Sequence, residues 1–378
     1  MRDGSKDRQK KTVAKPEASR RVSLKQLAAH LGLNPATVSV VLNDVPGRSI
    51  PEATRKRIKA AAKRMNYEPS LLARSFRSQR SLTIGILVPE LGDGYHSEVM
   101  SGIGDQLINA GYFYLTAHHR HRKDLIEDYT RMLVGRGAQG IIAIDTAIKH
   151  ATSVPVVAIA GHRRIKGVTN VVLDHSRAAE LALNHLYSLG HRQIAFMHGQ
   201  VFSSDSDVRW KSLVEVAAKI GLEIKPELVI GLDRDTSSPG LGYPVVQQLQ
   251  ATRLPFTALV AFNDISAIGA IRAFQDIQLR VPADISVIGF DDIKAAAFVV
   301  PGLTTIRQPL AEIGRIATQA LLDRIHGTDI ARDEIVVEPT LIIRESTGQV
   351  KLSSQLERST KNARTKVKIH PTLVDIQR

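Results

Sequence analysis

Three closely spaced histidines, His118, His119 and His121, are the side chains of this sequence whose type and spacing best suit a metal site. The positions between and just after them carry Arg or Lys, whose charge would repel a bound cation. An exposed basic loop is therefore the favoured interpretation, and we expect no metal site. The chain has no cysteine, which excludes structural disulfides, thiolate metal sites and cysteine nucleophiles.

A second candidate pattern, Gly102-Ile103-Gly104, begins like a dinucleotide-binding fingerprint. Leu107 stands where the third glycine belongs, and the segment has the periodicity of a helix. The chain also has no phosphate loop and no G-x-S-x-G motif. We therefore expect neither an enzyme nor a bound cofactor.

The charges of the chain point instead to a polyanionic partner. Residues 1–80 carry 19 Lys and Arg against 6 Asp and Glu, whereas residues 81–347 carry 25 against 29. A basic head on a slightly acidic body favours nucleic acid as the partner. A membrane surface fits less well, because the head has few large apolar residues. No secretory signal and no membrane helix are visible, so we expect a cytoplasmic bacterial protein.

The segment Val22–Asn43 has the pattern of two short helices separated by a tight turn. Ser23 and Gln26 form a capping box, Gly32 suits the left-handed end of a helix, and Asn34 is a good N-cap. Apolar residues repeat at helical spacing: Leu24, Leu27, Ala28 and Leu31, then Val38, Val41 and Leu42. This is the helix-turn-helix pattern, whose second helix enters the major groove of DNA. An ordinary helical hairpin in a core is the alternative.

Beyond a third, basic helix from about residue 51 to residue 65, the chain changes to alternating buried strands and helices. We predict nine strands, at residues 82–89, 113–117, 140–144, 154–160, 170–174, 193–199, 228–232, 258–262 and 286–290. Amphipathic helices lie between them and after the last. This alternation predicts parallel, doubly covered sheets, and the number of units favours two Rossmann-like lobes. A ligand would then bind at the carboxyl ends of the strands.

These segments together resemble the LacI/GalR family of transcription regulators. The resemblance is carried by VSLKQLAAHLGLNPATVSVVLN, MNYEPSLLARSF, LYSLGHRQIAFMHG, ALVAFNDISAIGAIRAFQDIQLRVPADISVIGFDD and LTTIRQP. It implies a small all-α helix-turn-helix domain followed by an α/β core of two lobes, like a periplasmic binding protein. It also implies a homodimer that binds near-palindromic double-stranded DNA and a small-molecule effector, such as a sugar or a related metabolite.

On this basis the chain divides into five parts. They are a disordered basic arm (1–21), a helix-turn-helix domain (22–68), a hinge helix (69–81), a two-lobed core (82–347) and a disordered basic tail (348–378). Within the core we expect an N-lobe of about 82–173 and 307–335 and a C-lobe of about 174–306 and 336–347. The lobes would close about crossover strands near Leu173, Arg307 and Val336.

The resemblance also implies which residues contact DNA. The major-groove positions are Pro35, Ala36 and Val40, and Val40 departs from the family's usual arginine. The phosphate-contacting positions are Ser23, Lys25, Thr37, Ser39, Asn43, Thr54 and Tyr67. For Thr37 and Ser39, plain helix-surface polarity is the alternative. In the hinge, Ala73 and Arg74 match the family, and Phe76 replaces the leucine that wedges into the minor groove.

The implied effector contacts are Tyr95, His96, Arg209, Asn263 and Asp291. Forked donors, an amide and charged acceptors suit a polar ligand rich in hydroxyl groups. Two positions depart from the family, because Ala160 replaces an aspartate and Ser237 replaces a stacking aromatic residue.

The function that follows is that of a transcription repressor whose operator affinity is switched by a small polar metabolite. An activator or global regulator of the same architecture is the closest alternative. A solute-binding receptor would share the two-lobed core, but it would need a signal peptide and would lack the basic head. Sustained leucine heptads are missing from the tail, which favours a dimer over a tetramer.

The wedge assigned to Phe76 is testable. The variant Phe76→Ala should weaken specific operator binding, because an inserted aromatic ring unstacks and kinks a base step. Ligand binding should stay intact. Fluorescence anisotropy with labelled operator measures the first and calorimetry the second. An unchanged operator affinity would show that Phe76 is not a wedge.

Overall fold

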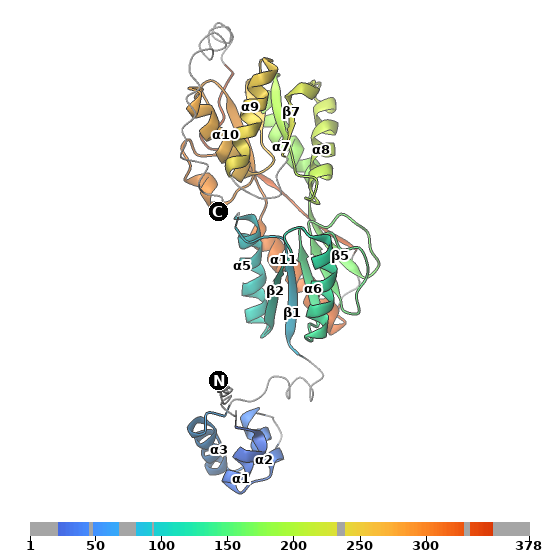
Figure 1. The fold of residues 1–378 in the computed structure, drawn as a ribbon, viewed down its shortest axis with the longest axis vertical. Coiled ribbons are helices and arrows are strands. Elements are labelled where there is room, and N and C mark those ends of the chain that lie inside the picture. Colours follow the sequence, from blue (N-terminus) through green and yellow to red (C-terminus); the bar gives the residue numbers. More distant parts are fainter. Residues whose placement is uncertain are drawn as a thin grey trace, which may run out of the picture. The chain divides into compact units, whose positions relative to one another are not determined.

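The computed structural model describes residues 22–44, 48–67, 81–92, 94–232, 239–328 and 333–350. The predicted arm, the hinge with Ala73, Arg74 and Phe76, and the tail beyond Val350 lie outside these residues. The chain divides into two compact units, Met1–Ser81 and Leu82–Arg378 (Figure 1).

The described residues of the first unit form three helices, α1 (Leu24–Leu31), α2 (Pro35–Leu42) and α3 (Glu52–Arg64). The predicted capping box is confirmed, because Ser23 Oγ accepts from the Gln26 N–H at 3.3 Å and Gln26 Oε1 accepts from the Ser23 N–H at 2.8 Å. Gly32 ends α1 at φ +63°, in the left-handed region that favours glycine. These local signals fix where α1 and α2 begin and end.

The three helices pack around one small apolar core. Its fully buried side chains are Leu27, Val38, Val41, Ile58 and Ala61. The Arg57 guanidinium donates to the Leu31 carbonyl at 2.9 Å, so α3 also covers the carboxyl end of α1. The predicted apolar faces of α1 and α2 therefore form the interior of this unit.

The N-lobe of the second unit is built on a six-stranded parallel sheet. In the order β11-β5-β4-β3-β1-β2, its strands are Glu334–Val337, Val168–Leu173, Val156–Ile159, Gly140–Ile144, Thr83–Val88 and Phe113–His118. Helices α5 (Tyr95–Asn109) and α11 (Leu310–His326) cover one face, and α6 (Lys123–Gly135) covers the other (Figure 1).

Gly102 of the apparent dinucleotide motif has a packing role, which it shares with Gly314 of α11. A β-carbon on Gly102 of α5 would lie 1.9 Å from the Ala311 carbonyl oxygen of α11. A β-carbon on Gly314 would lie 2.3 Å from the Val99 carbonyl oxygen. The two helix backbones therefore approach so closely that only glycine fits on each side.

The C-lobe repeats this architecture. In the order β12-β10-β9-β8-β6-β7, its strands are Thr340–Ile342, Thr304–Arg307, Ser286–Asp291, Ala258–Val260, Ile194–His198 and Val229–Gly231. Only β12 is antiparallel to its neighbour. Helices α7 (His175–Ser188) and α8 (Ser206–Lys219) cover one face, and α9 (Gly242–Thr252) and α10 (Asp264–Asp276) cover the other. The described residues of this lobe also form short 3-10 helices at η1 (Pro226–Leu228), η2 (Pro239–Leu241) and η3 (Lys294–Ala297).

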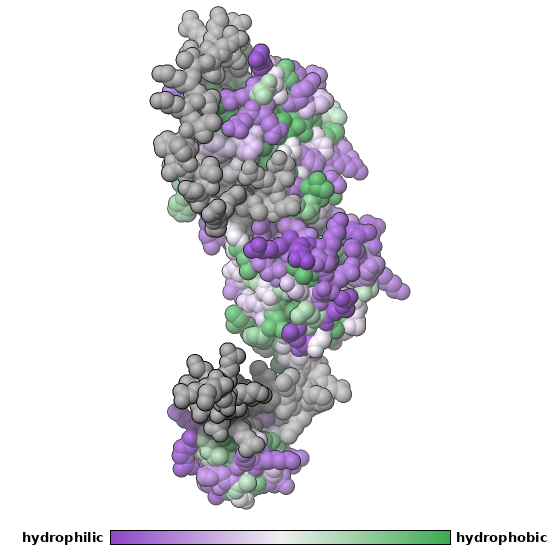
Figure 2. All heavy atoms as spheres, in the orientation of Figure 1, coloured by the Kyte–Doolittle hydropathy of each residue, from purple (hydrophilic) through white to green (hydrophobic). Residues whose placement is uncertain are grey.

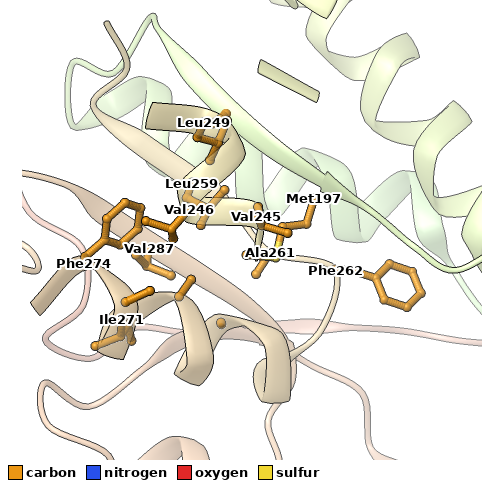
Figure 3. Packing of buried hydrophobic residues seen from close by; sticks show 14 of the residues in the cluster. Met197, Val245, Val246, Leu249, Leu259, Ala261, Phe262, Ile271, Phe274 and Val287 are labelled. Atoms are coloured by element: carbon orange, nitrogen blue, oxygen red, sulfur yellow. The ribbon is translucent and has the colours of Figure 1, made fainter. Parts of the chain in front are cut away.

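Strand residues of this lobe alternate between the two faces of the sheet. On β6, Ala195 and Met197 face α9 and α10, whereas Ile194 and Phe196 face α7 and α8. Figure 3 shows the first of these faces, where side chains of α9 and α10 meet those of the strands. Both faces are apolar, which confirms the prediction of doubly covered, mostly parallel sheets.

The chain passes between the lobes three times, after β5, after β10 and between β11 and β12. Two expected lobe boundaries shift. Arg307 ends β10 in the C-lobe sheet, paired with Asp291, and Val336 lies on β11 in the N-lobe sheet, paired with Val172. The ordered core also continues past residue 347, because the Val350 N–H donates to the Leu189 carbonyl at 2.9 Å.

Hydrophilic residues predominate on the face of the two lobes seen in Figure 2, with apolar residues scattered among them. Among the described helices, none has the length and apolar character needed to cross a bilayer.

Asp264 connects the start of α10 to two neighbouring segments. It is fully buried, and its carboxylate accepts from Thr305 Oγ1 at 2.6 Å and from the Ile293 N–H at 2.9 Å. Burial, reinforced by the charge of Asp292, raises the pKa of the Asp264 carboxyl to about 7.

Asp264 should therefore make stability depend on pH. A carboxyl whose pKa is higher in the folded state stabilises fully below its unfolded pKa, and this contribution is lost as pH rises through about 7. Asp264→Asn should reduce the loss of unfolding free energy between about pH 5 and about pH 8, as measured by urea denaturation. Asp276→Asn, at an exposed position of the same helix, serves as the control. An identical pH dependence in all three proteins would contradict the prediction.

Candidate DNA-binding face and ligand cleft

The predicted major-groove positions lie on α2. Pro35 and Ala36 are exposed in its first turn, and Val40 is partly buried one turn later. Asn34 caps this end, since its Oδ1 accepts from the Ala36 N–H at 2.8 Å. The start of α2 therefore presents an apolar surface that can contact a thymine methyl group but cannot form a bidentate hydrogen bond with a base.

The predicted phosphate positions differ in exposure. Those exposed are Ser23, Lys25 and Asn43, and those partly buried are Thr37, Thr54 and Tyr67. Ser39 is buried, with 5% of its surface exposed, which contradicts its expected presentation at the surface. It lies on the inner side of α2 beside Val38 and Val41, and its hydroxyl accepts from Asn43 Nδ2 at 3.2 Å. Ser39 therefore has a structural role within α2.

In the core, the charges that act on Tyr95 show which side chains converge. Burial raises the pKa of the Tyr95 phenol well above its usual value, and the carboxylates of Asp205, Asp145 and Asp291 raise it further, whereas Arg209 opposes them. Three of the predicted effector residues, Tyr95, Arg209 and Asp291, are thus brought into one site. Asp145 and Asp205 belong to the same site and were not predicted.

Arg209 is buried, with 7% of its surface exposed, and its guanidinium lies between two aromatic rings. Its Cζ atom lies 3.7 Å from the ring centre of Phe290 and 4.5 Å from that of Phe262. It donates to the Phe262 carbonyl at 2.6 Å and to Asp205 Oδ2 at 3.1 Å. In Figure 3, Phe262 is accordingly set apart from the other labelled core residues.

Asp205 forms the centre of a buried polar group. Its Oδ1 atom lies 2.6 Å from His162 Nε2 and 3.3 Å from His175 Nε2. Burial works against ionisation of Asp205, but the two imidazoles and Arg209 hold the pKa of its carboxyl well below its usual range. His162 comes from the N-lobe and Asp205 from the C-lobe, so the group joins the two lobes.

The loop that precedes α8 makes further contacts with the N-lobe. Ser204 Oγ lies 2.7 Å from Asp145 Oδ1 and 2.6 Å from the Ala160 carbonyl oxygen. The Phe202 ring packs on His121, with ring centres 3.8 Å apart. Elsewhere between the lobes, Lys294 of η3 pairs with Glu98 of α5 at 3.0 Å. The lobes are therefore in contact, and the cleft between them is closed in this structure.

The remaining predicted effector residues have specific local environments. Asp291 ends β9 with φ +116°, a rare backbone conformation for a non-glycine residue, and accepts from Gln308 Nε2 at 2.7 Å. Asn263 caps α10 by accepting from the Ser266 N–H at 2.9 Å. His96 is buried and meets the Tyr95 ring edge-on, with ring centres 5.0 Å apart. All five residues, Tyr95 and Arg209 included, remain predictions as effector contacts.

The expectation of an exposed histidine loop is only partly met, because His118 is exposed but ends strand β2, and it is wrong for His119, which is buried. His119 is 1% exposed, and its Nε2 atom lies 2.8 Å from Thr146 Oγ1. Burial, with smaller contributions from His121 and His118, lowers the pKa of His119 to about 4. The reason is that His119 follows β2 directly and turns inward beside the end of β3.

The site residues that sequence reasoning missed share one feature. Asp145, His162, His175 and Asp205 follow β3, β4, β5 and β6, respectively, near the carboxyl ends of these strands. Parallel sheets bind ligands at that edge. Listing the polar residues just after each predicted strand would have found Asp145, His162 and His175, whereas Asp205 lies further along the chain, directly before α8.

Comparison with known protein families gives two matches. Residues 23–70 match the family described as bacterial regulatory proteins, lacI family, and residues 183–347 match the periplasmic binding protein-like domain. The HTH-type transcriptional repressor PurR of Aliivibrio fischeri strain MJ11 is 30% identical over 332 residues, which cover 86% of this chain and 98% of the relative. PurR of Mannheimia succiniciproducens is 28% identical over 337 residues, covering 87% and 99%.

Solved structures show the same fold. The Lac repressor dimer bound to operator and the anti-inducer ONPF has a TM-score of 0.79 at 24% identity, covering 87% of this chain and all of that one. The complex of the transcriptional regulator CelR with cellobiose has a TM-score of 0.63 at 26% identity, covering 86% and 100%.

The burial of Arg209 leads to a stability prediction. Arg209→Met should lower the unfolding free energy by about 3 kcal/mol, because it leaves the buried Asp205 carboxylate without its guanidinium partner. Arg177→Met, which breaks an exposed pair with Glu180, should cost less than about 1 kcal/mol. Urea denaturation followed by Trp210 fluorescence measures both losses. Equal losses in the two variants would contradict the prediction.

Proposed function

The chain belongs to the lacI family of bacterial regulatory proteins, and we propose that this transcriptional repressor binds a near-palindromic operator as a homodimer and changes its affinity when a polar metabolite occupies the cleft. The observation that carries the proposal is the helix-turn-helix of the first unit together with the buried polar side chains of Asp205, Arg209 and Asp291 in the core. The relatives are repressors, which confirms the prediction that the chain is not an enzyme.

The DNA-binding part of the proposal is supported by the first unit. Its helix-turn-helix exposes the start of α2, and its α3 carries exposed basic residues such as Lys56, Lys63 and Arg64. Contacts of Lys and Arg with phosphates supply affinity without reading sequence. Lys25 and Asn43 are the exposed polar residues that we propose contact phosphates, with Phe76 as the minor-groove wedge.

The ligand part of the proposal depends on the chemistry of the cleft. Asp145 and Asp291 can accept hydrogen bonds from hydroxyl groups, and Tyr95 can both donate and accept. A set dominated by acceptors suits a neutral ligand with several hydroxyl groups, such as a sugar. The similar regulator CelR is solved in complex with cellobiose, a ligand of this class.

The switch itself requires two states of the core. The lobes are linked by three chain crossings and by the contacts of Ser204 and Lys294. A ligand that contacts both lobes favours the closed state, and it can change operator affinity only by binding the two states with different affinities. We propose that closure changes how the two subunits present their DNA-binding domains.

The test begins with an operator selected from random DNA and a ligand found by a thermal-shift screen of sugars and related metabolites. The ligand should change the operator Kd by at least about fivefold, as measured by anisotropy. Asp291→Asn should keep the affinity of the ligand-free protein for operator and lose most of this change.

Lys25→Ala is the matched variant in the other unit. It should weaken operator binding and reduce its dependence on salt, while ligand binding stays unchanged. An operator affinity that no metabolite alters would refute the switch. A salt-independent affinity would refute the proposed DNA-binding face.

A further inference from the structure

Two histidines and one aspartate in the core have the composition and proximity of a metal-binding group. The candidate ligand atoms of His162, His175 and Asp205 all lie within 4.8 Å of one another. The three residues are distant in sequence, and none belongs to the histidine cluster that the sequence suggested. Their meeting is a product of the fold.

Each residue comes from a different segment. His162 follows β4 in the N-lobe, His175 begins α7 just after the first crossing between the lobes, and Asp205 immediately precedes α8 in the C-lobe. The side chains of His175 and Asp205 are 3% and 9% exposed, whereas that of His162 is 18% exposed. The group is therefore well shielded, and an ion can enter beside His162.

Neighbouring residues hold these side chains in place. Arg209 donates to Oδ2 of Asp205, which leaves Oδ1 turned toward the two imidazoles. The His175 ring stacks on Phe290, with an angle of 28° between the planes. A cavity of about 20 Å³ beside His175 has room for one water molecule, which can accept a hydrogen bond from Nδ1–H. Such outer contacts orient metal ligands in proteins.

We propose that His162, His175 and Asp205 bind one divalent transition-metal ion of the zinc type between the two lobes. Two imidazole nitrogens and one carboxylate oxygen are preferred donors for Zn²⁺ and Co²⁺, and water can supply the fourth ligand. The charge of Arg209 opposes a nearby cation, but its guanidinium is paired with Oδ2 of Asp205, on the side of the carboxylate away from the two imidazoles. The ion would connect the lobes directly and so stabilise the closed core.

The distances need little adjustment. Ligand atoms around tetrahedral zinc lie about 3.4 Å apart, given bonds of about 2.1 Å. The separation of His175 Nε2 and Asp205 Oδ1 is 3.3 Å already, and that of His162 Nε2 and Oδ1 is 2.6 Å. The ligand atoms of the two histidines lie within 4.8 Å of each other, so the more exposed His162 must move by roughly 1 to 1.5 Å to reach this spacing. Without an ion, both imidazoles can donate to Oδ1, and this hydrogen-bonded arrangement is the competing interpretation.

The experiment uses the untagged full chain after treatment with a chelator. Calorimetric titration with Zn²⁺ should show one ion per chain, and Co²⁺ should give the intense visible absorption of a tetrahedral complex. Bound Zn²⁺ should raise the melting temperature of the core. His162→Gln, at the most exposed ligand, should weaken Zn²⁺ binding by at least about tenfold while the metal-free protein keeps its wild-type circular dichroism.

His121→Gln is the matched control, because it removes a partly buried histidine of the N-lobe that is not one of the proposed ligands, and it should leave Zn²⁺ affinity unchanged. Two results would overturn the proposal. The first is that the wild-type protein binds Zn²⁺ no better than His162→Gln, which would show that the group is hydrogen-bonded only. The second is that Zn²⁺ binding is lost in His121→Gln but kept in His162→Gln, which would place the ion elsewhere. Neither result depends on DNA binding, so the proposed repressor function is tested separately.

Discussion

The closed cleft depends on the burial of one carboxylate, that of Asp205. A buried charge is stable only when it is paired and hydrogen-bonded. Here the partners are Arg209 from the C-lobe, His175 at the crossing and His162 from the N-lobe. Because the partners of Asp205 come from both lobes, any opening of the cleft exposes Asp205 or separates it from one partner. The cost of that separation is one source of the energy difference between open and closed states that a ligand can change.

Much of the fold could be predicted because its signals are local. Capping residues mark the ends of α1 and α2, and runs of branched apolar residues mark the buried strands. The strands missed, β10, β11 and β12, are short, and β11 and β12 are partly exposed. Their periodicity is too brief to stand out, and β10 is stabilised by pairing with β9.

The site was less predictable, because its residues are joined only by tertiary structure. Tyr95, Arg209 and Asp291 were inferred from a family resemblance, and the fold does bring them together. His162 and His175 belong to no sequence motif. The loop after β4 and the start of α7, which carry them, are brought together only by the tertiary fold. Ser39 and His119 were misjudged for the opposite reason. Polar side chains were assumed to be exposed, although each finds a hydrogen-bond partner inside its domain.

The DNA-binding unit presents the reverse situation. Its local structure follows from the sequence, but few of its side chains can recognise bases. A bidentate hydrogen bond to a base contributes about 1–3 kcal/mol of discrimination, and none of Pro35, Ala36 and Val40 can form one. Apolar contact with thymine methyl groups discriminates more weakly. If this repressor selects its operator, most of the selectivity must therefore come from the spacing of two half-sites and from how readily the central base steps deform. A helix that docks through phosphates and an apolar surface makes DNA shape the main determinant of specificity.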